Sequence, residues 1–84
     1  MYWDVASAEP ASHLALKVTF VDGLQGEVRF KPSHLTGVFA SLQDEAYFNQ
    51  VYVEHGVVTW PGELDLAPDA MHTEIKKHGY WVLE

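Results

Sequence analysis

The chain of 84 residues contains no cysteine, only five Lys and Arg residues against 12 Asp and Glu, and no long hydrophobic run. Without cysteine it can form neither a disulfide framework, nor a thiolate metal site, nor a cysteine nucleophile. The N-terminus lacks the basic and apolar regions of a signal peptide, and no stretch is long and apolar enough to span a membrane. We therefore expect a cytoplasmic protein with no membrane association.

Basic residues are also missing from the middle of the chain, because no Lys or Arg occurs between Lys31 and Lys76. That interval holds seven carboxylates, which equal the formal net charge of −7. A surface of this sign repels nucleic-acid phosphates and favours a basic partner protein. The alternative is that the excess acid only keeps a small protein in solution. The seven carboxylates are Asp44, Glu45, Glu54, Glu63, Asp65, Asp69 and Glu74.

Apolar and aromatic side chains, by contrast, are abundant. Hydrophobic residues make up 48% of the chain and aromatic residues 13%, far more than a disordered segment contains. The length predicts a single domain over residues 1–84, near the size at which one core supplies only a few kcal/mol of net stability. A homodimer or a complex with a partner protein would add to that stability.

Three stretches in the first third of the chain alternate between apolar and polar residues, which is typical of half-buried strands. Residues 3–7 alternate weakly and are followed by Pro10, which predicts an edge-like strand. Residues 14–20 and 24–30 alternate more regularly around a glycine, which predicts a β-hairpin.

The register of this hairpin follows from the two faces of its strands, because residues directly opposite each other share a face. A three-residue loop that ends in Gly23 pairs Leu16 with Val28 and Lys17 with Glu27. A two-residue loop would instead place apolar residues opposite polar ones. We therefore predict the three-residue loop.

Residues 35–42 show the helical spacing i, i+3, i+4 and i+7, which predicts a helix that ends near residues 43–44. Ser33 is the expected N-cap, because its hydroxyl can accept a hydrogen bond from an unpaired amide. Gly37 inside the helix costs about 1 kcal/mol relative to alanine, so we expect it to mark close packing onto the sheet. The apolar positions are Leu35, Val38, Phe39 and Leu42.

A second hairpin is predicted by residues 51–53 and 57–60, which are rich in β-branched and aromatic residues and flank a glycine. A three-residue loop between them pairs Val53 with Val57, as in the first hairpin. The second strand is expected to end at Pro61, which cannot donate to a ladder.

The last part of the chain predicts a short helix from Pro68 to Gly79, with an acidic residue at its start and basic residues at its end. Residues 80–83 are apolar, and they either pack back onto the sheet or contact another chain. The whole order predicts an α+β fold, β-β-β-α-β-β-α, in which an N-terminal strand and two β-hairpins form a small antiparallel sheet and two short helices pack against it.

The junction between the last predicted strand and the last helix carries a distinctive motif: Trp60, Pro61, Gly62, Asp65, Leu66, Pro68 and Asp69. Weaker signals precede it at Leu16, Val18, Phe20, Asp22, Gly23, Leu35, Phe39, Leu42, Phe48 and Val51. Together they resemble the small bacterial domain-of-unknown-function family numbered 2442 (DUF 2442) over residues 14–71. The resemblance implies a compact α+β domain with no established activity and no catalytic residues.

Members of that family are often encoded beside another small protein, in an arrangement like a toxin and antitoxin pair. The resemblance therefore implies an antitoxin-like role. Some members carry a helix-turn-helix after this domain. Because the chain ends at Glu84, we expect no such unit and no direct operator binding.

The candidate binding residues lie on or near the same motif: Trp60, Glu63, Asp65, Asp69 and Tyr52. The three carboxylates fall within seven residues and could coordinate a hard cation such as Mg²⁺ or Ca²⁺. Their spacing lacks the regular alternation and the final Glu of a calcium loop. The favoured alternative is structural, with Asp65 in the turn and Asp69 at the positive end of the helix.

The aromatic residues of this region, Trp60, Tyr52 and Tyr47, resemble a base-stacking platform in composition only. Such platforms come with a basic groove, and this half of the chain has no basic residue. Packing in the core or at a protein interface is the better interpretation.

Other cofactor and catalytic signatures are missing from the sequence. The five histidines lack the paired spacing of a zinc site. Ser33 beside His34 lacks the third residue of a catalytic triad. There is also no phosphate loop or dinucleotide fingerprint. We therefore predict no cofactor and a non-enzymatic protein-interaction module that binds a basic partner protein. The alternatives are a small metal-binding or enzymatic domain that uses the three carboxylates, and a homodimeric structural domain.

Overall fold

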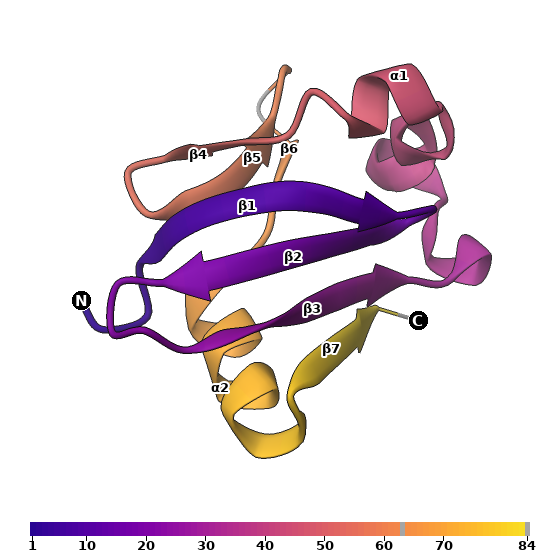
Figure 1. Cartoon of the computed structure of the whole chain (residues 1–84). Helices are drawn as coiled ribbons and strands as arrows, with labels where there is room; N and C mark the ends of the chain where they lie inside the picture. The colour runs from indigo at the N-terminus through magenta and orange to yellow at the C-terminus, as the bar shows by residue number, and fades with distance from the viewer. Residues whose placement is uncertain (63, 84) are drawn as a thin grey trace.

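The structure is a computed structural model that describes residues 1–62 and 64–83, including every side chain of these except His34 and Val38. Figure 1 shows the chain from end to end. In order, the elements are β1 (Val5–Ser12), β2 (Ala15–Phe20), β3 (Gln25–Phe30), the 3-10 helices η1 (Pro32–His34) and η2 (Gly37–Gln43), α1 (Glu45–Phe48), β4 (Tyr52–Glu54), β5 (Val57–Trp60), β6 (Leu64–Asp65), α2 (Pro68–His78) and β7 (Tyr80–Leu83).

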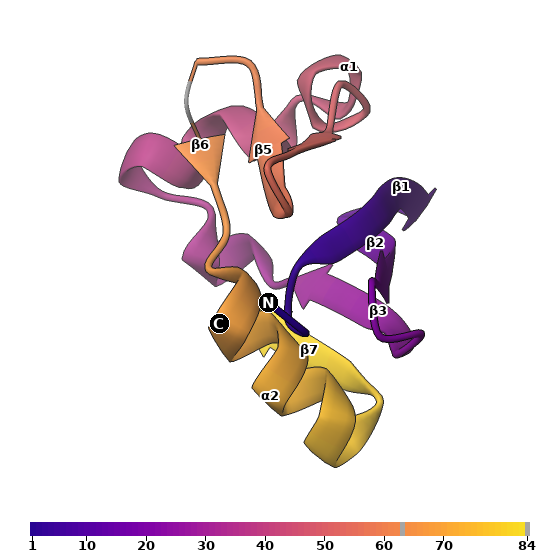
Figure 2. The ribbon, with the colours of Figure 1, turned by 90° about the vertical axis from the view of Figure 1, so that its left-hand side faces the viewer.

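The strands form two sheets, which Figure 2 shows on different sides of the core. One has the order β1-β2-β3-β7 and the other β4-β5-β6. The predicted α+β class is confirmed, but the prediction of one small antiparallel sheet is wrong in detail. The chain reverses after Pro61 to add β6 beside β5, and β7 pairs with β3 in parallel.

The first hairpin matches its predicted register. Leu16 lies opposite Val28 and Lys17 opposite Glu27. Gly23 has a φ of +92°, the left-handed conformation that a three-residue loop requires at its last position.

The N-terminal strand is an edge strand, as predicted, but it lies later in the chain than residues 3–7. It runs from Val5 to Ser12 and includes Pro10. An edge strand tolerates proline because the N–H on its open side needs no partner strand. The pairing of β1 with β2 shifts register between Val5 and Ser7 and again between Pro10 and Ser12.

The predicted helix over residues 35–42 is wrong. Most of the segment belongs to the 3-10 helix η2, and η1 lies just before it. Neither has a side-chain cap, so Ser33 is not an N-cap. Gly37 begins η2 with a φ of +57°, and a Cβ there would meet nothing within 4 Å, so it does not mark close packing. The apolar spacing still reports burial correctly, because Leu35 and Leu42 are both in the core.

The second hairpin exists, but its predicted register is wrong. Val53 lies opposite Val58 rather than Val57. The loop contains two residues, His55 and Gly56, and both have positive φ, at +52° and +77°. Positive φ at both central positions is the mark of a type I′ turn, which matches the twist of the flanking strands.

Helix α2 confirms the prediction from the helix signals. Pro68 lies in its first turn, and Gly79 caps its end in the left-handed conformation. The C-terminal residues Tyr80–Leu83 pack back onto the sheet as β7, which was one of the two alternatives. No helix in the described ranges is long and apolar enough to cross a lipid bilayer.

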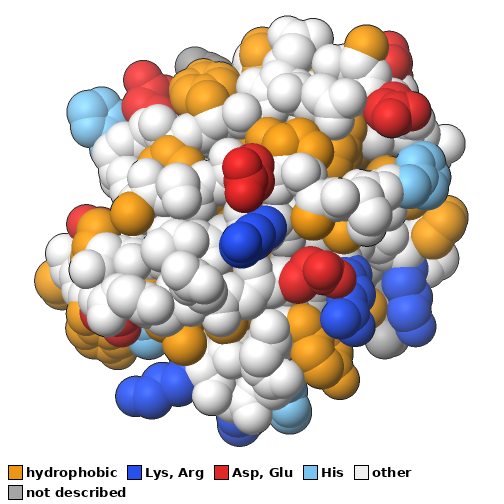
Figure 3. All heavy atoms as spheres, viewed as in Figure 1, with side chains coloured by type: hydrophobic (Ala, Val, Ile, Leu, Met, Phe, Trp, Pro, Cys, Tyr) orange, Lys and Arg blue, Asp and Glu red, His pale blue; other side chains and the backbone are white. Residues whose placement is uncertain are grey.

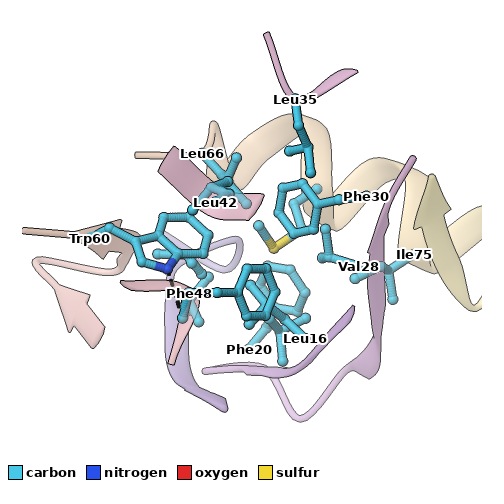
Figure 4. Packing of buried hydrophobic residues seen from close by; sticks show 14 residues of the cluster. Leu16, Phe20, Val28, Phe30, Leu35, Leu42, Phe48, Trp60, Leu66 and Ile75 are labelled. Atoms are coloured by element: carbon cyan, nitrogen blue, oxygen red, sulfur yellow. Dashed lines mark hydrogen bonds between the residues drawn. The ribbon is translucent and has the colours of Figure 1, made fainter. Parts of the chain in front are cut away.

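The core lies between the two sheets and α2, and Figure 4 shows its aromatic centre. Phe30 contacts the rings of Phe48 and Trp60 edge-on, with centroids 5.6 and 6.1 Å away. The indole N–H of Trp60 donates to the Phe48 carbonyl at 2.9 Å. The other buried apolar side chains are Val5, Ala15, Leu16, Val18, Phe20, Val28, Leu35, Leu42, Val58, Leu66, Met71 and Ile75.

Candidate functional site

The junction between β5 and α2 is held by backbone pairing on both sides of its turn. Gly62 has a φ of +94°, which lets the chain reverse after Pro61. Strand β6 then pairs with β5, and the Leu66 amide donates to the Val58 carbonyl at 3.0 Å. The Tyr47 hydroxyl donates to the Pro61 carbonyl and so ties α1 to the turn. The junction is therefore a fixed part of the fold.

Trp60, one of the predicted binding residues, is fully buried. Both its ring and its indole N–H are used inside the core. Its position agrees with the core interpretation of the aromatic residues. A partner on the surface would meet its neighbours and not Trp60 itself.

Two other predicted residues, Tyr52 and Asp65, come together on the outer face of the small sheet. Both lie opposite Thr59 in the ladder, one from β4 and one from β6. Residues opposite each other share a face, so the three side chains form a row across the sheet. Tyr52 is 42% exposed and Asp65 is exposed. A shallow hollow on this face is lined by Glu54, His55, Val57, Thr59 and Asp65.

Asp65 also borders a second, larger groove on the other side of β6. Its walls combine polar and apolar surface, and the aromatic side chains of Tyr47 and Phe39 are half-buried in them. The groove is lined by Phe39, Ser41, Tyr47, Pro61, Gly62, Leu64 and Asp65. We call this groove, the hollow beside it and Tyr52 the Asp65 surface.

The groove residues outside the motif were not predicted to belong to a site. Phe39 and Ser41 come from η2 and Tyr47 from α1, so only the folded chain brings them beside β6. The sequence does carry one signal that Tyr47 lies near the surface, since it is placed between acidic residues and a buried phenylalanine. It does not reveal the contact with Pro61, which is 14 residues away.

Five carboxylates of the basic-free interval lie at the surface. Asp44, Glu45, Glu54, Asp65 and Asp69 are all exposed. Within residues 1–62 and 64–83, none of these five forms an ion pair with Lys or Arg. Their charge is therefore available to a binding partner.

The charge on the four-stranded sheet is mixed, because side chains of both signs lie side by side on its outer face (Figure 3). Lys17 lies between Glu9 and Glu27 across the ladder. Arg29 pairs with Glu27, and its guanidinium carbon lies 4.6 Å from the centre of the Tyr80 ring. This face is close to electrically balanced, unlike the surface around Asp65.

The three carboxylates considered as an alternative metal site include Glu63, which lies outside the described residues. Asp65 ends β6, and Asp69 lies in the first turn of α2 near its positive end. Among the described residues, no group of three His, Cys, Asp or Glu side chains is placed to hold a metal ion. The position of Asp69 in the first turn of α2 fits the structural role, because a carboxylate there faces the positive end of the helix.

A buried histidine, His72, forms a polar contact that the sequence did not predict. Its Nε2 lies 2.8 Å from Oδ2 of Asp22, in the loop between β2 and β3. Its ring also packs edge-on against Phe20 and Tyr2. Because 50 residues separate His72 from Asp22, no local pattern announces the pair.

The environment of Asp22 favours its charged form. The Leu24 amide donates to the Asp22 carboxylate at 3.0 Å, and this bond, followed by the one to His72, lowers the pKa of Asp22 below 3.8. His72 itself is 4% exposed. The pair therefore ties α2 to the first hairpin, with the His72 ring buried and the Asp22 carboxylate partly exposed.

A family model described as a protein of unknown function (DUF2442) matches residues 5–77. The chain belongs to the DUF2442 family. This match confirms the resemblance drawn from the sequence motifs, and it extends from β1 almost to the end of α2. It includes the whole Asp65 surface of this DUF2442 domain. Neither the curated proteins nor the solved structures contain a match to the chain.

Proposed function

We propose that this DUF2442 domain is a non-enzymatic protein-interaction module, and that its Asp65 surface binds a basic partner protein. The observation that carries the proposal is the position of Asp65 between two hollows, in a region whose exposed carboxylates have no Lys or Arg partners among the described residues. In this proposal the domain is the antitoxin-like member of a two-gene pair.

The side chains around Asp65 suit an arginine or lysine of the partner. A guanidinium can stack on an exposed aromatic ring and pair with a carboxylate at the same time. Tyr52 supplies such a ring on one side of Asp65, and the half-buried Tyr47 lies in the groove on the other. Aromatic residues are also enriched in protein interfaces.

The unpaired carboxylates add a second effect, on the rate of association. A surface of one sign attracts a partner of the opposite sign over distances of about 10 Å at moderate salt. Because Asp44, Glu45 and Glu54 are exposed, they contribute to this field without needing direct contact. Binding should therefore weaken as the salt concentration rises.

The location of His72 supports a binding role over acid–base catalysis. It is the one histidine among the described residues that pairs with a carboxylate at hydrogen-bond distance, and it is almost fully buried. A general base must reach the proton that it removes. His72 is therefore better suited to holding the fold together.

The test is a pull-down from the native host with the tagged chain, followed by co-purification with the product of the adjacent reading frame. We expect a second small basic protein with the wild type and its loss with Asp65→Lys. The matched control is Glu9→Lys, which reverses an exposed charge on the four-stranded sheet and should leave capture unchanged. Recovery of only the tagged chain itself would contradict the proposal.

A further inference from the structure

The two edges of the four-stranded sheet are protected to very different degrees. Edge strand β1 contains Pro10 and a glutamate, and its pairing is interrupted by two register shifts. Proline, charge and irregular pairing are the devices that keep a sheet edge from joining another strand. The other edge strand, β7, reads Tyr, Trp, Val, Leu and has none of them.

The free side of β7 presents a defined set of backbone groups. On its paired side, the Glu27 amide donates to the Gly79 carbonyl at 3.4 Å and the Lys31 amide donates to the Leu83 carbonyl at 2.9 Å. Successive residues of a strand point their N–H and C=O groups to opposite sides. Tyr80 and Val82 therefore point theirs away from β3, where no strand of the described residues pairs with them.

We propose that β7 pairs antiparallel with β7 of a second copy of this chain, about a two-fold axis. Opposite residues must share a face, which leaves registers centred on Trp81 or on Val82. The register centred on Trp81 places Tyr80 of each copy opposite Val82 of the other. Both of these pairs then exchange hydrogen bonds, whereas the other register uses one such pair among the described residues of β7. The Trp81 register is therefore favoured.

The side chains around β7 fit this arrangement. Trp81 lies opposite Val28 on the core side of the sheet and packs partly against the core. A shallow groove beside the strand is lined by Glu74 and His78 of α2 together with residues of β7. It can receive a side chain from the second copy.

Charge favours a second copy over the basic partner at this edge. The net charge of −7 equals the carboxylates of the basic-free interval, and the remaining acidic and basic residues balance. Arg29 lies against Tyr80, and Lys76 and Lys77 are in the last turn of α2. Charges of both signs therefore lie beside this edge, Glu74 among them, so it lacks the unbalanced acid that would attract a basic protein and lets a second copy approach.

Pairing at β7 would join the two four-stranded sheets into one continuous sheet. The Asp65 surface is on the other sheet and stays open in each copy. The dimer is therefore independent of the proposed binding of a basic partner. Because a strand pair of four residues buries little area, the dimer should dissociate on dilution.

The first test is amide hydrogen exchange by NMR on the whole chain at two concentrations about a hundredfold apart, together with sedimentation. We expect the Tyr80 and Val82 amides to exchange about fivefold or more slowly at the higher concentration, as the dimer forms. The Trp81 amide, which faces β3, should be protected equally at both. Free exchange of Tyr80 and Val82 at both concentrations, with monomeric sedimentation, would overturn the proposal.

A variant separates pairing at the free edge from the pairing with β3. Val82→Pro removes an N–H that points to the free edge and leaves the groups that face β3, so it should sediment as a monomer with an unchanged fold. Val82→Thr keeps the N–H and should still dimerise. Equal dimerisation of both variants would overturn the proposal. Slow exchange of the Tyr80 and Val82 amides that requires an added basic protein would also overturn it. If Val82→Pro does not fold, the exchange experiment decides.

Discussion

Trp60 combines the largest side chain of the core with a buried hydrogen bond. It is fully buried, and its N–H satisfies the Phe48 carbonyl. A smaller ring leaves a cavity and removes one of the two donors to that carbonyl, the other being the Val51 amide at 3.3 Å.

Trp60→Phe should therefore lower the free energy of unfolding by about 2–3 kcal/mol, measured by urea denaturation. Tyr52→Phe, which changes an exposed ring on the neighbouring strand, is the control and should change it by less than about 0.5 kcal/mol. A similar effect of the two substitutions would show that Trp60 is not central to the core.

Asp22 is the residue at which pH should act on stability. Its pKa is lowered in the folded chain, first by the Leu24 amide and then by His72, so its contribution is fully present above its unfolded pKa near 3.8. The contribution is lost as the pH falls through the lowered folded value.

The stability difference between the wild type and Asp22→Asn should therefore shrink as the pH is lowered from about 5 to about 2. Urea denaturation across this range measures it. An unchanged or growing difference at low pH would mean that the charge of Asp22 is not what holds the loop to α2.

At the level of elements, the turn between β4 and β5 is the clearest local constraint. His55 and Gly56 both have positive φ, and a Cβ on Gly56 would lie 2.7–2.9 Å from atoms of the Asp4 side chain. The turn therefore depends on residues that tolerate the left-handed conformation.

Gly56→Ala should cost about 1–3 kcal/mol of stability, because it adds both backbone strain and this clash. His55→Asn should instead stabilise the domain by a few tenths of a kcal/mol, since Asn-Gly is a preferred type I′ pair. Thermal unfolding of the two variants checks both signs. Destabilisation by His55→Asn would argue against a two-residue turn.

Local patterns predicted the elements whose partners are close in sequence. The first hairpin and α2 followed from alternation, Gly23 and the helix signals. The prediction of an α-helix over residues 35–42 was wrong, because the apolar spacing there indicates which residues are buried and not the type of helix. The segment is a 3-10 helix that begins at Gly37 with a positive φ. The predicted register of the second hairpin was wrong because nothing local indicates that His55 also adopts positive φ.

The candidate site was predictable only in part, for the same reason. The motif from Trp60 to Asp69 located the junction, and the charge pattern indicated an acidic surface. The burial of Trp60 and the row from Tyr52 to Asp65 depend on strand pairing between distant segments. The groove depends further on Tyr47, which reaches the Pro61 carbonyl across 14 residues.

The whole molecule separates two kinds of surface. The four-stranded sheet carries balanced charges and an unprotected edge strand, whereas the small sheet carries Asp65 between two hollows. In our two proposals, self-association belongs to one sheet and binding of a basic protein to the other. The family match covers the second surface, while β7 begins after the last matched residue.

Salt should act on these two surfaces differently. Raising the salt from about 0.05 to about 0.5 M should weaken binding of a basic partner, because it screens the exposed carboxylates. The same change should leave the β7 dimer nearly unaffected, because its contacts are backbone hydrogen bonds and apolar side chains. Sedimentation and partner titration at both salt concentrations test this, and equal sensitivity would contradict the division.

The central claim is that the Asp65 surface binds the proposed basic partner, and the affinity of that partner for matched charge variants tests it most directly. Calorimetric titration should show that Asp65→Asn weakens binding about tenfold or more, because the partner's cation loses its carboxylate. Glu9→Gln, which removes an exposed carboxylate from the four-stranded sheet, should change the affinity less than about twofold. Equal affinities for the wild type and Asp65→Asn, or a larger loss with Glu9→Gln, would contradict the claim that the Asp65 surface is the binding site.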